Sequence, residues 1–338
     1  MVSIIMPTYN KCKYLELTLC GFINQTYKDF QIIIIDDGST DATYEIVNSF
    51  VSLLNINYVY QNNQGRAAAR NKGLSLVTGD YIIFCDDDRI PSRSLIEEHI
   101  LILMNDKKIV TIGYKKEILT VLRNNKTYQI PFIFDILKKY PDILKTDYYE
   151  EDIQLFSRTD ITENIDKILK TNNIIEGPDN FHEVYEYFDK NLKNFYFGWV
   201  LGTTANLGIR YNDIASLSFD EQYKNWGMED TNFSYDLYKR GFNFYLAEGA
   251  INYHQIHDKE SNYHNSLLRN IKYFYVKYNN IETALFALLI LSNISIIEIN
   301  NLFDFIKNDT SNKANISLMN VVQKLIKESK FLNNEYLS

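Results

Sequence analysis

The first 115 residues alternate short, almost uninterrupted apolar runs with stretches of helix length, and this alternation restricts the fold more than any other feature. The apolar runs are VSIIM (2–6), QIIIID (31–36), NYVY (57–60), YIIFC (81–85) and KIVTIGY (108–114). Spaced apolar positions indicate helices over 11–24, 41–54, 65–77 and 92–104. Strands that are apolar throughout are buried on both faces, so the pattern predicts an α/β domain with a mainly parallel, Rossmann-like sheet between helices.

The rest of the chain has a different texture. Residues 115–195 are charged, rich in Tyr and largely helical in period, which predicts an insertion or lid over the sheet. Glycines concentrate between 196 and 258, and the chain after 265 is again helical in period. The apolar stripes of these last helices are expected either if they pack on the domain or if they mediate a homo-oligomer.

Composition excludes several classes of protein. The chain carries 35 basic and 43 acidic residues, a net charge of −8 that argues against a nucleic-acid-binding protein. Its 3 cysteines form no disulfide framework and suit a reducing compartment. The start shows no signal peptide, and the apolar stretch ALFALLILS (284–292) is about half as long as a membrane-spanning helix requires. We therefore expect a soluble, cytoplasmic protein.

Three polar clusters follow predicted strands. They are PTYN (7–10), DDGST (36–40) and CDDD (85–88), and ligands of open α/β sheets bind beyond the carboxyl ends of the strands. Side chains alternate along an extended segment, so Asp86 and Asp88 should point to one side and Asp87 to the other. Asp86 and Asp88 suit a divalent cation or the hydroxyls of a ribose, although a solvated loop that leads into the next helix explains these carboxylates equally well.

Two further segments could bind the same ligand. Asp37 follows a buried strand and can accept a hydrogen bond from a nucleobase, but a simple turn with a helix cap is the more frequent use of such a sequence. Arg66 and Arg70 lie four residues apart near the start of a helix. They can clamp a diphosphate or contribute ordinary surface charge.

The segment NWGMED and the histidines after it add candidates for catalysis and metal binding. Glu229 and Asp230 begin a helix, where carboxylates are favoured by the helix dipole, and either could also act as a general base beside Trp226. His254 and His257 are three residues apart, so their imidazoles can reach one side of a turn. Such a pair can ligate a metal, although a structural role is more common.

In this order the motifs resemble family 2 glycosyltransferases of the GT-A fold. The resemblance rests on VSIIMPTYN, IIIIDDGSTDAT, NQGRAAARNKGL and TGDYIIFCDDDRIPS. The later WGMEDTNFSYDLYKRGF and its two histidines resemble the C-terminal part of β-1,4-galactosyltransferases and polypeptide GalNAc-transferases. The resemblance implies a GT-A domain over 1–264 and a helical C-terminal extension over 265–338. Within the domain it implies a nucleotide-sugar half (1–114), a helical insertion (115–195) and an acceptor and catalytic half (196–264).

The resemblance also implies roles for individual residues. The predicted donor-binding residues are Pro7, Tyr9 and Asp37 at the uracil, Arg70 near the donor, Asp86 toward the ribose, and Asp87 inside the DxD motif. The predicted ligands of Mn²⁺ or Mg²⁺ are Asp88, His254 and His257. Asp230 would be the catalytic base, assisted by Glu229, and Trp226 and Gly227 would line the acceptor or sugar site.

These roles imply a metal-dependent, inverting transfer of a hexose or N-acetylhexosamine from a UDP-sugar. The acceptor is a glycan, a glycolipid or a peptide, with bacterial surface-glycan assembly as the first expectation. No QxxRW motif of processive synthases is present, which favours single addition, and peripheral association with the inner face of the membrane is compatible with the sequence. The alternatives are a peptide or protein glycosyltransferase, a non-catalytic sugar-nucleotide-binding module and a sugar nucleotidyltransferase. The last is disfavoured because PTYNKCKY contains no glycine.

Overall fold

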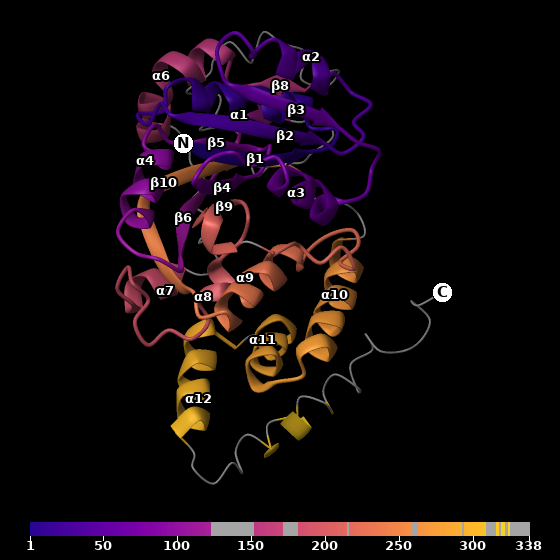
Figure 1. Cartoon of the computed structure of the whole chain (residues 1–338), viewed down its shortest axis with the longest axis vertical. Coiled ribbons are helices and arrows are strands. Elements are labelled where there is room, and N and C mark those ends of the chain that lie inside the picture. Colours follow the sequence, from indigo (N-terminus) through magenta and orange to yellow (C-terminus); the bar gives the residue numbers. More distant parts are fainter. Residues whose placement is uncertain are drawn as a thin grey trace.

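The computed structural model describes residues 1–122, 152–171, 182–214, 216–257, 263–292 and 294–308, with a few isolated residues between 316 and 324. An eight-stranded sheet in the order β3-β2-β1-β4-β9-β6-β10-β5 lies mainly in the upper half of the molecule in Figure 1. Its parallel part comprises β3 (Ile56–Tyr60), β2 (Phe30–Asp36), β1 (Val2–Thr8) and β4 (Tyr81–Cys85). The predicted α/β class with a mainly parallel sheet is confirmed.

Different helices cover the two faces of the sheet. Along β4, Ile83 packs in one hydrophobic core, with the helices over 12–23 and 95–103. Ile82 and Phe84 pack in a second hydrophobic core, with the C-terminal helices. This alternation follows from the period of two in a strand. The helices of the N-terminal half are α1 (Cys12–Ile23), α2 (Thr43–Asn48), α3 (Arg66–Leu74) and α4 (Leu95–Leu103).

Helix α2 is shorter than the stretch 41–54 that the sequence predicts. It ends at Asn48, and the chain continues in turns in which the Phe50 carbonyl accepts from the amides of Leu53 and Leu54. Phe50 and Leu54 are buried, while Val51 and Leu53 are exposed. The apolar positions that suggested a longer helix therefore reach the core from a turn.

The second half of the sheet is mixed in direction. β9 (Asn206–Arg210) runs antiparallel between β4 and β6 (Ile109–Ile118). β10 (Asn243–Gln255) is parallel to β6, and the short β5 (Arg89–Pro91) is antiparallel to the end of β10. The last pairing joins the segment after the Asp triplet to the segment that carries the two histidines.

The described parts of 115–195 are not all helical. β6 continues to Ile118, and β7 (Val121–Leu122) pairs with β8 (Ile153–Gln154). Helix α6 (Arg158–Thr171) packs beside α1, where Arg158 Nε bonds Glu16 Oε1. A short helix, α7 (His182–Tyr187), follows. The rest of the predicted insertion, 123–151 and 172–181, lies outside the described residues.

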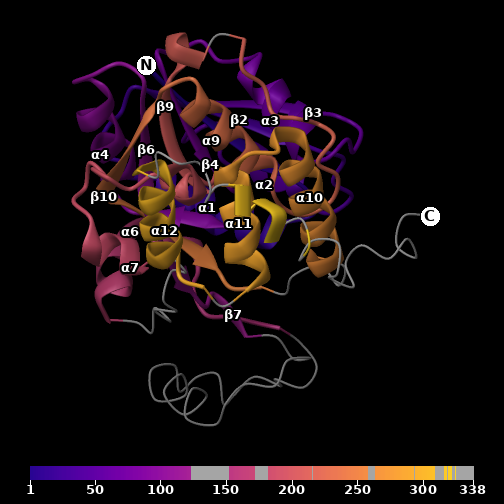
Figure 2. The ribbon, with the colours of Figure 1, turned by 90° about the horizontal axis from the view of Figure 1, so that it is seen from below.

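The C-terminal helices share a core with residues of the segment 196–257. They are α10 (Tyr263–Tyr278), α11 (Ile281–Leu291) and α12 (Ile296–Asn308), and in Figure 2 they lie side by side across one face of the molecule. Trp199, fully buried in α8 (Gly198–Leu201), contacts the rings of Tyr235, Phe274 and Phe286. The predicted extension is therefore packed directly on the domain, and most of its final stretch (309–338) lies outside the described residues.

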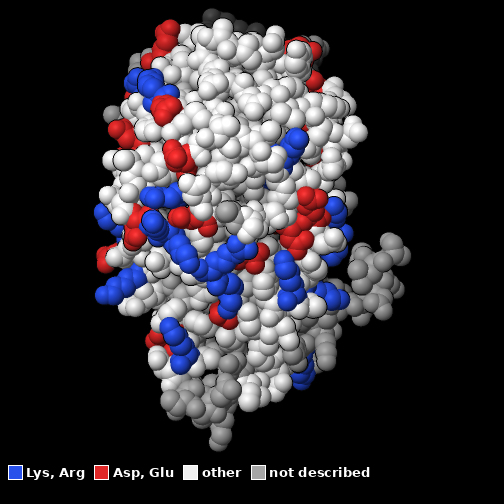
Figure 3. Space-filling view, in the orientation of Figure 1, with Lys and Arg blue, Asp and Glu red and all other residues white. Residues whose placement is uncertain are grey.

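The surface of the molecule carries charges of both signs. On the face shown in Figure 3, Lys and Arg gather around the boundary between the sheet and the C-terminal helices, mixed with Asp and Glu. Within the described residues, no helix is both long enough and apolar enough to cross a membrane.

Candidate active site

The predicted polar clusters lie at one edge of the sheet. Tyr9 follows β1, Asp37 follows β2, and Asp86 to Asp88 follow β4. β1 pairs in parallel with both β2 and β4, so the three carboxyl ends are neighbours. The edge therefore has the location expected of a ligand site in an open α/β sheet.

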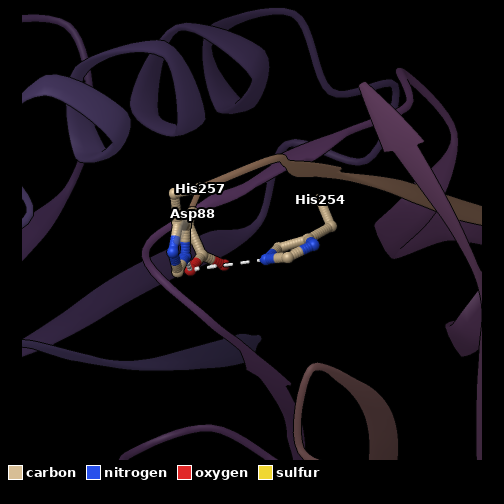
Figure 4. A group of neighbouring side chains, drawn as sticks. All are labelled: Asp88, His254 and His257. Carbon is tan, nitrogen blue, oxygen red and sulfur yellow. Dashed lines mark hydrogen bonds and ion pairs between the residues drawn. The ribbon is translucent and has the colours of Figure 1, made fainter. Parts of the chain in front are cut away.

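Asp88, His254 and His257 form a cluster of metal-ligand type. Their ligand atoms all lie within 4.8 Å of one another, and Figure 4 shows the three side chains close together. Asp88 Oδ2 is 2.8 Å from His257 Nε2 and 3.8 Å from His254 Nε2. The structure thus brings together the three residues that the resemblance assigned to the metal.

Short strand β5 is the reason that this cluster forms. Arg89 in β5 stands opposite His254 in β10, and the backbone N–H of Gln255 donates to the Asp88 carbonyl at 2.9 Å. Two segments that are more than 160 residues apart are therefore held in register beside each other. His257 follows two residues after β10 ends and completes the group.

The electrostatics of the cluster suit a divalent cation. Burial alone would raise the pKa of Asp88, but the His257 hydrogen bond, His254, Arg89 and Lys11 together lower it below its usual range. Burial and the charge of Arg89 lower the pKa of His254 to about 4, so its imidazole is neutral at pH 7. An ionised carboxylate beside a neutral imidazole belongs to the donor sets that Mn²⁺ or Zn²⁺ accepts in proteins.

His257 Nε2 provides a second test of the fit. It lies 2.6 Å from Lys11 Nζ and 2.8 Å from Asp88 Oδ2. A ring nitrogen can donate to the carboxylate or accept from the ammonium, but it cannot do both. With the ring proton on Nδ1, Nε2 presents its lone pair beside the anionic oxygen of Asp88, and these two atoms then suit a metal ion bound to both.

Arg70 joins the Asp triplet to the start of α9 (Glu229–Lys239). Its Nη1 donates to Glu229 Oε1 at 2.9 Å, and its Nη2 donates to Asp86 Oδ1 at 3.1 Å. Arg70 is buried, whereas Arg66, four residues earlier, is exposed. The bridge fixes Asp86 and Glu229 relative to each other.

Asp230 lies beside this bridge. Burial, reinforced by the charge of Glu229, raises the pKa of Asp230 to about 6. Its Oδ1 accepts from the backbone N–H of Thr231 at 2.7 Å. A carboxylate that is ionised at neutral pH but more basic than usual has the properties of a general base.

Asp87 has a different environment from those of Asp86 and Asp88. Its side chain is buried, and burial together with the charge of Asp88 raises its pKa to about 7. Asp86 pairs with Arg70, and Asp88 pairs with His257. The three consecutive carboxylates therefore have three different environments, which limits the repulsion between them.

The predicted uracil residues lie at the ends of β1 and β2. Asp37 accepts from Gln61 Nε2 at 2.7 Å and from the backbone N–H groups of Gln64 and Gly65 at 2.9 and 2.8 Å. It thus fixes the loop that enters α3. Pro7 is half-buried, and Tyr9 is 49% exposed, which leaves its ring accessible to a base.

The loop before α9 has an unusual backbone. Asn225, Gly227 and Met228 all have positive φ, at 62°, 90° and 80°. Asn270 in α10 holds this loop, since its Nδ2 lies within hydrogen-bond distance of the carbonyl oxygens of Lys224 (3.1 Å), Trp226 (3.2 Å) and Gly227 (2.9 Å). A C-terminal helix therefore positions the residues that were predicted to line the acceptor site.

Sequence reasoning missed Lys11, Arg89 and Asn270. Nothing in PTYNKCKY distinguishes Lys11 from Lys13, yet the first reaches His257 and the second does not. Asn270 is one of many asparagines in an Asn-rich chain. Only the tertiary contacts show that these residues belong to the site.

Comparison with known proteins agrees with the arrangement. The family model described as Glycosyl transferase family 2 matches residues 3–163. Chondroitin synthase of Escherichia coli is 30% identical over 298 residues, which cover 84% of this chain and 40% of the relative. An uncharacterized glycosyltransferase of Haemophilus influenzae is 32% identical over 172 residues, which cover 44% of this chain and 69% of the relative. The chain thus spans well under half of the chondroitin synthase.

Solved structures of S. aureus TarS have a similar fold. One matches with a TM-score of 0.53 and 16% identity, over 86% of this chain and 42% of TarS. TarS 1-349 in complex with UDP-GlcNAc matches with a TM-score of 0.50 and 16% identity, over 98% of this chain and 74% of that one. This likeness supports the fold, and the sequence matches support the family. The chain belongs to glycosyltransferase family 2.

Proposed function

We propose that this chain transfers a hexose or N-acetylhexosamine from a UDP-sugar to a glycan acceptor, with inversion and with the help of Mn²⁺ or Mg²⁺. One observation carries the proposal. The turn Asp86–Asp88 contributes one carboxylate to the cluster with His254 and His257 and another to the bridge through Arg70 beside Asp230. A metal-ligand group and a candidate base therefore meet at one edge of the sheet.

The donor is assigned from the strand ends and from the fold. Tyr9 offers an exposed ring at the end of β1, and Asp37 is held rigidly by three hydrogen bonds beside it. The TarS complex with UDP-GlcNAc, which has the same fold, supports a UDP-sugar as the class of donor. A nucleotide bound here would place its diphosphate toward Asp88.

The residues around the turn account for the chemistry. When bound by Asp88, His254 and His257, a divalent cation would screen the charge that develops on the leaving UDP. Asp230 takes the proton of the acceptor hydroxyl while that oxygen attacks the anomeric carbon, and the bond to UDP breaks on the opposite face. The Arg70 bridge fixes the carboxylate of Glu229 near Asp230, and the charge of Glu229 raises the pKa of this base while the charge of Arg70 lowers it.

The fall of kcat/KM at acidic pH should reflect the protonation of Asp230. A base works in its deprotonated form, and the pKa of Asp230 is raised to about 6 by burial and by Glu229. We expect kcat/KM to be level near pH 7 and above, and to fall about tenfold per pH unit below about pH 6. In Glu229→Gln this fall should move to lower pH, because a negative neighbour is lost. If kcat/KM of Glu229→Gln falls at the same pH as that of the wild type, Asp230 is not the general base.

Asn270 should matter for the acceptor loop. In Asn270→Ala three carbonyl groups lose their shared donor, and we expect the free energy of unfolding to fall by about 1–3 kcal/mol. Misplacement of Trp226 and Gly227 should also raise the KM for the acceptor while the KM for the UDP-sugar changes little. Arg269→Ala is the matched control, since Arg269 bonds only the Lys224 carbonyl of this loop. Equal acceptor KM values in both variants would argue against a positioning role.

A glycan is the preferred acceptor because one similar relative is named chondroitin synthase, and chondroitin is a glycan. A donor-hydrolysis screen, followed by mass spectrometry on acceptor arrays with the best donor, tests this assignment. We expect one sugar to be added to a glycan, with the opposite anomeric configuration to that in the donor. Transfer to peptides alone would favour the protein glycosyltransferase, and binding of UDP-sugars without any transfer or hydrolysis would favour the non-catalytic module.

A further inference from the structure

Lys11 places an ammonium group against two members of the metal-ligand cluster, Asp88 and His257. Its Nζ is 2.6 Å from His257 Nε2 and 3.7 Å from Asp88 Oδ2. It also lies over the ring of Tyr14, whose centroid is 5.1 Å away. About a quarter of the Lys11 side chain is exposed, so most of the side chain is covered by its neighbours.

This contact uses the atom that a metal would need. An imidazole nitrogen has one lone pair in the plane of its ring, and it can give that pair to an N–H donor or to a metal ion. Lys11 cannot be a metal ligand itself while it is an ammonium, because an ammonium has hydrogen-bond donors but no lone pair. A hydrogen bond from Lys11 to His257 Nε2 and a metal bond from the same atom therefore exclude each other.

We propose that Lys11 is an internal cation that competes with the divalent metal for His257 and Asp88. This inference rests on the proposed function, because it concerns the metal ligands assigned there. Metal binding then requires the ammonium to leave His257. The lysine stem is flexible, and the displaced ammonium lies at the edge of the sheet where a UDP diphosphate would bind.

The proposal implies that the metal and the nucleotide assist each other. A diphosphate offers the displaced ammonium a new anionic partner, so UDP lowers the cost of moving Lys11. By linkage, UDP should tighten Mn²⁺ binding, and Mn²⁺ should tighten UDP binding by the same factor. Removal of the ammonium should strengthen the metal site in the absence of nucleotide and weaken this coupling.

Lys11→Met tests the competition, with Lys13→Met as the matched control. Lys13 lies in the first turn of α1, two residues after Lys11, is 64% exposed and pairs with Asp152, so its loss removes the same charge outside the cluster. We would measure Mn²⁺ affinity by electron paramagnetic resonance, with and without UDP, in the wild type and both variants. Without UDP we expect Lys11→Met to bind Mn²⁺ on the order of tenfold more tightly, while Lys13→Met stays close to the wild type.

The outcomes separate this inference from the proposed function. Asp88→Asn in the Lys11→Met background should abolish the gain, which would assign it to this cluster. If the wild type binds Mn²⁺ and Lys11→Met binds it equally or more weakly, the competition is wrong, and the metal assignment stands. If no variant binds Mn²⁺ even with UDP, and UDP release continues in EDTA, the metal assignment fails and the inference fails with it.

Discussion

Asp88→Asn should lower the rate of UDP release from the donor by about 10²–10⁴-fold. Asp88 is the only carboxylate in the described cluster, and its Oδ2 lies closest to the second ligand, His257. An amide keeps the shape but loses the negative charge that holds a divalent cation. A bound metal contributes several kcal/mol of charge stabilisation in the transition state, and each 1.36 kcal/mol corresponds to about tenfold in rate.

Asp87→Asn is the control for this substitution. Its carboxyl is buried beside Asp88, and its raised pKa of about 7 means that it is already partly neutral at physiological pH. The amide should therefore change the rate much less than Asp88→Asn does. The free energy of unfolding of both variants should be measured together with their rates. Equal losses of activity in the two variants, or no loss in either, would show that the DxD assignment is wrong.

Asp230→Asn should lower kcat by about 10²–10⁴-fold while the affinities for UDP and Mn²⁺ stay close to those of the wild type. The base acts on the acceptor hydroxyl, and Asp230 is not part of the Asp88 cluster. Single-turnover rates and calorimetric titration with UDP separate the two effects. A normal kcat would exclude Asp230 as the base, and a loss of UDP affinity equal to the loss of rate would place it at the donor instead.

Much of the fold could be predicted because its strands are buried on both faces. Ile32 to Ile35 are fully buried, and such a run has few alternatives in a soluble domain. The end of α2 and the strand β5 could not be predicted. β5 has three residues, RIP, and forms a strand only because the end of β10 lies beside it. A segment of this length has no periodicity of its own.

The residues of the candidate site were more predictable than their contacts. The sequence motifs predict Asp88, His254 and His257 as metal ligands, and the structure brings these three side chains together. Lys11 reaches His257 across 246 residues of chain, and no local pattern encodes such a contact. The apolar stripes of the C-terminal helices predicted that these segments bury one face. Only the packing around Trp199 shows that the covered surface belongs to the segment 196–257.

Release of UDP by the wild-type chain tests the central claim most directly. It should be measured with UDP-Glc, UDP-GlcNAc, UDP-Gal and UDP-GalNAc, first in EDTA and then with added Mn²⁺. We expect turnover with at least one of these donors, its loss in EDTA and its recovery with Mn²⁺. The absence of turnover with every donor, together with unchanged nucleotide binding in Asp88→Ala, would contradict the assignment of this site as a metal-dependent sugar transferase.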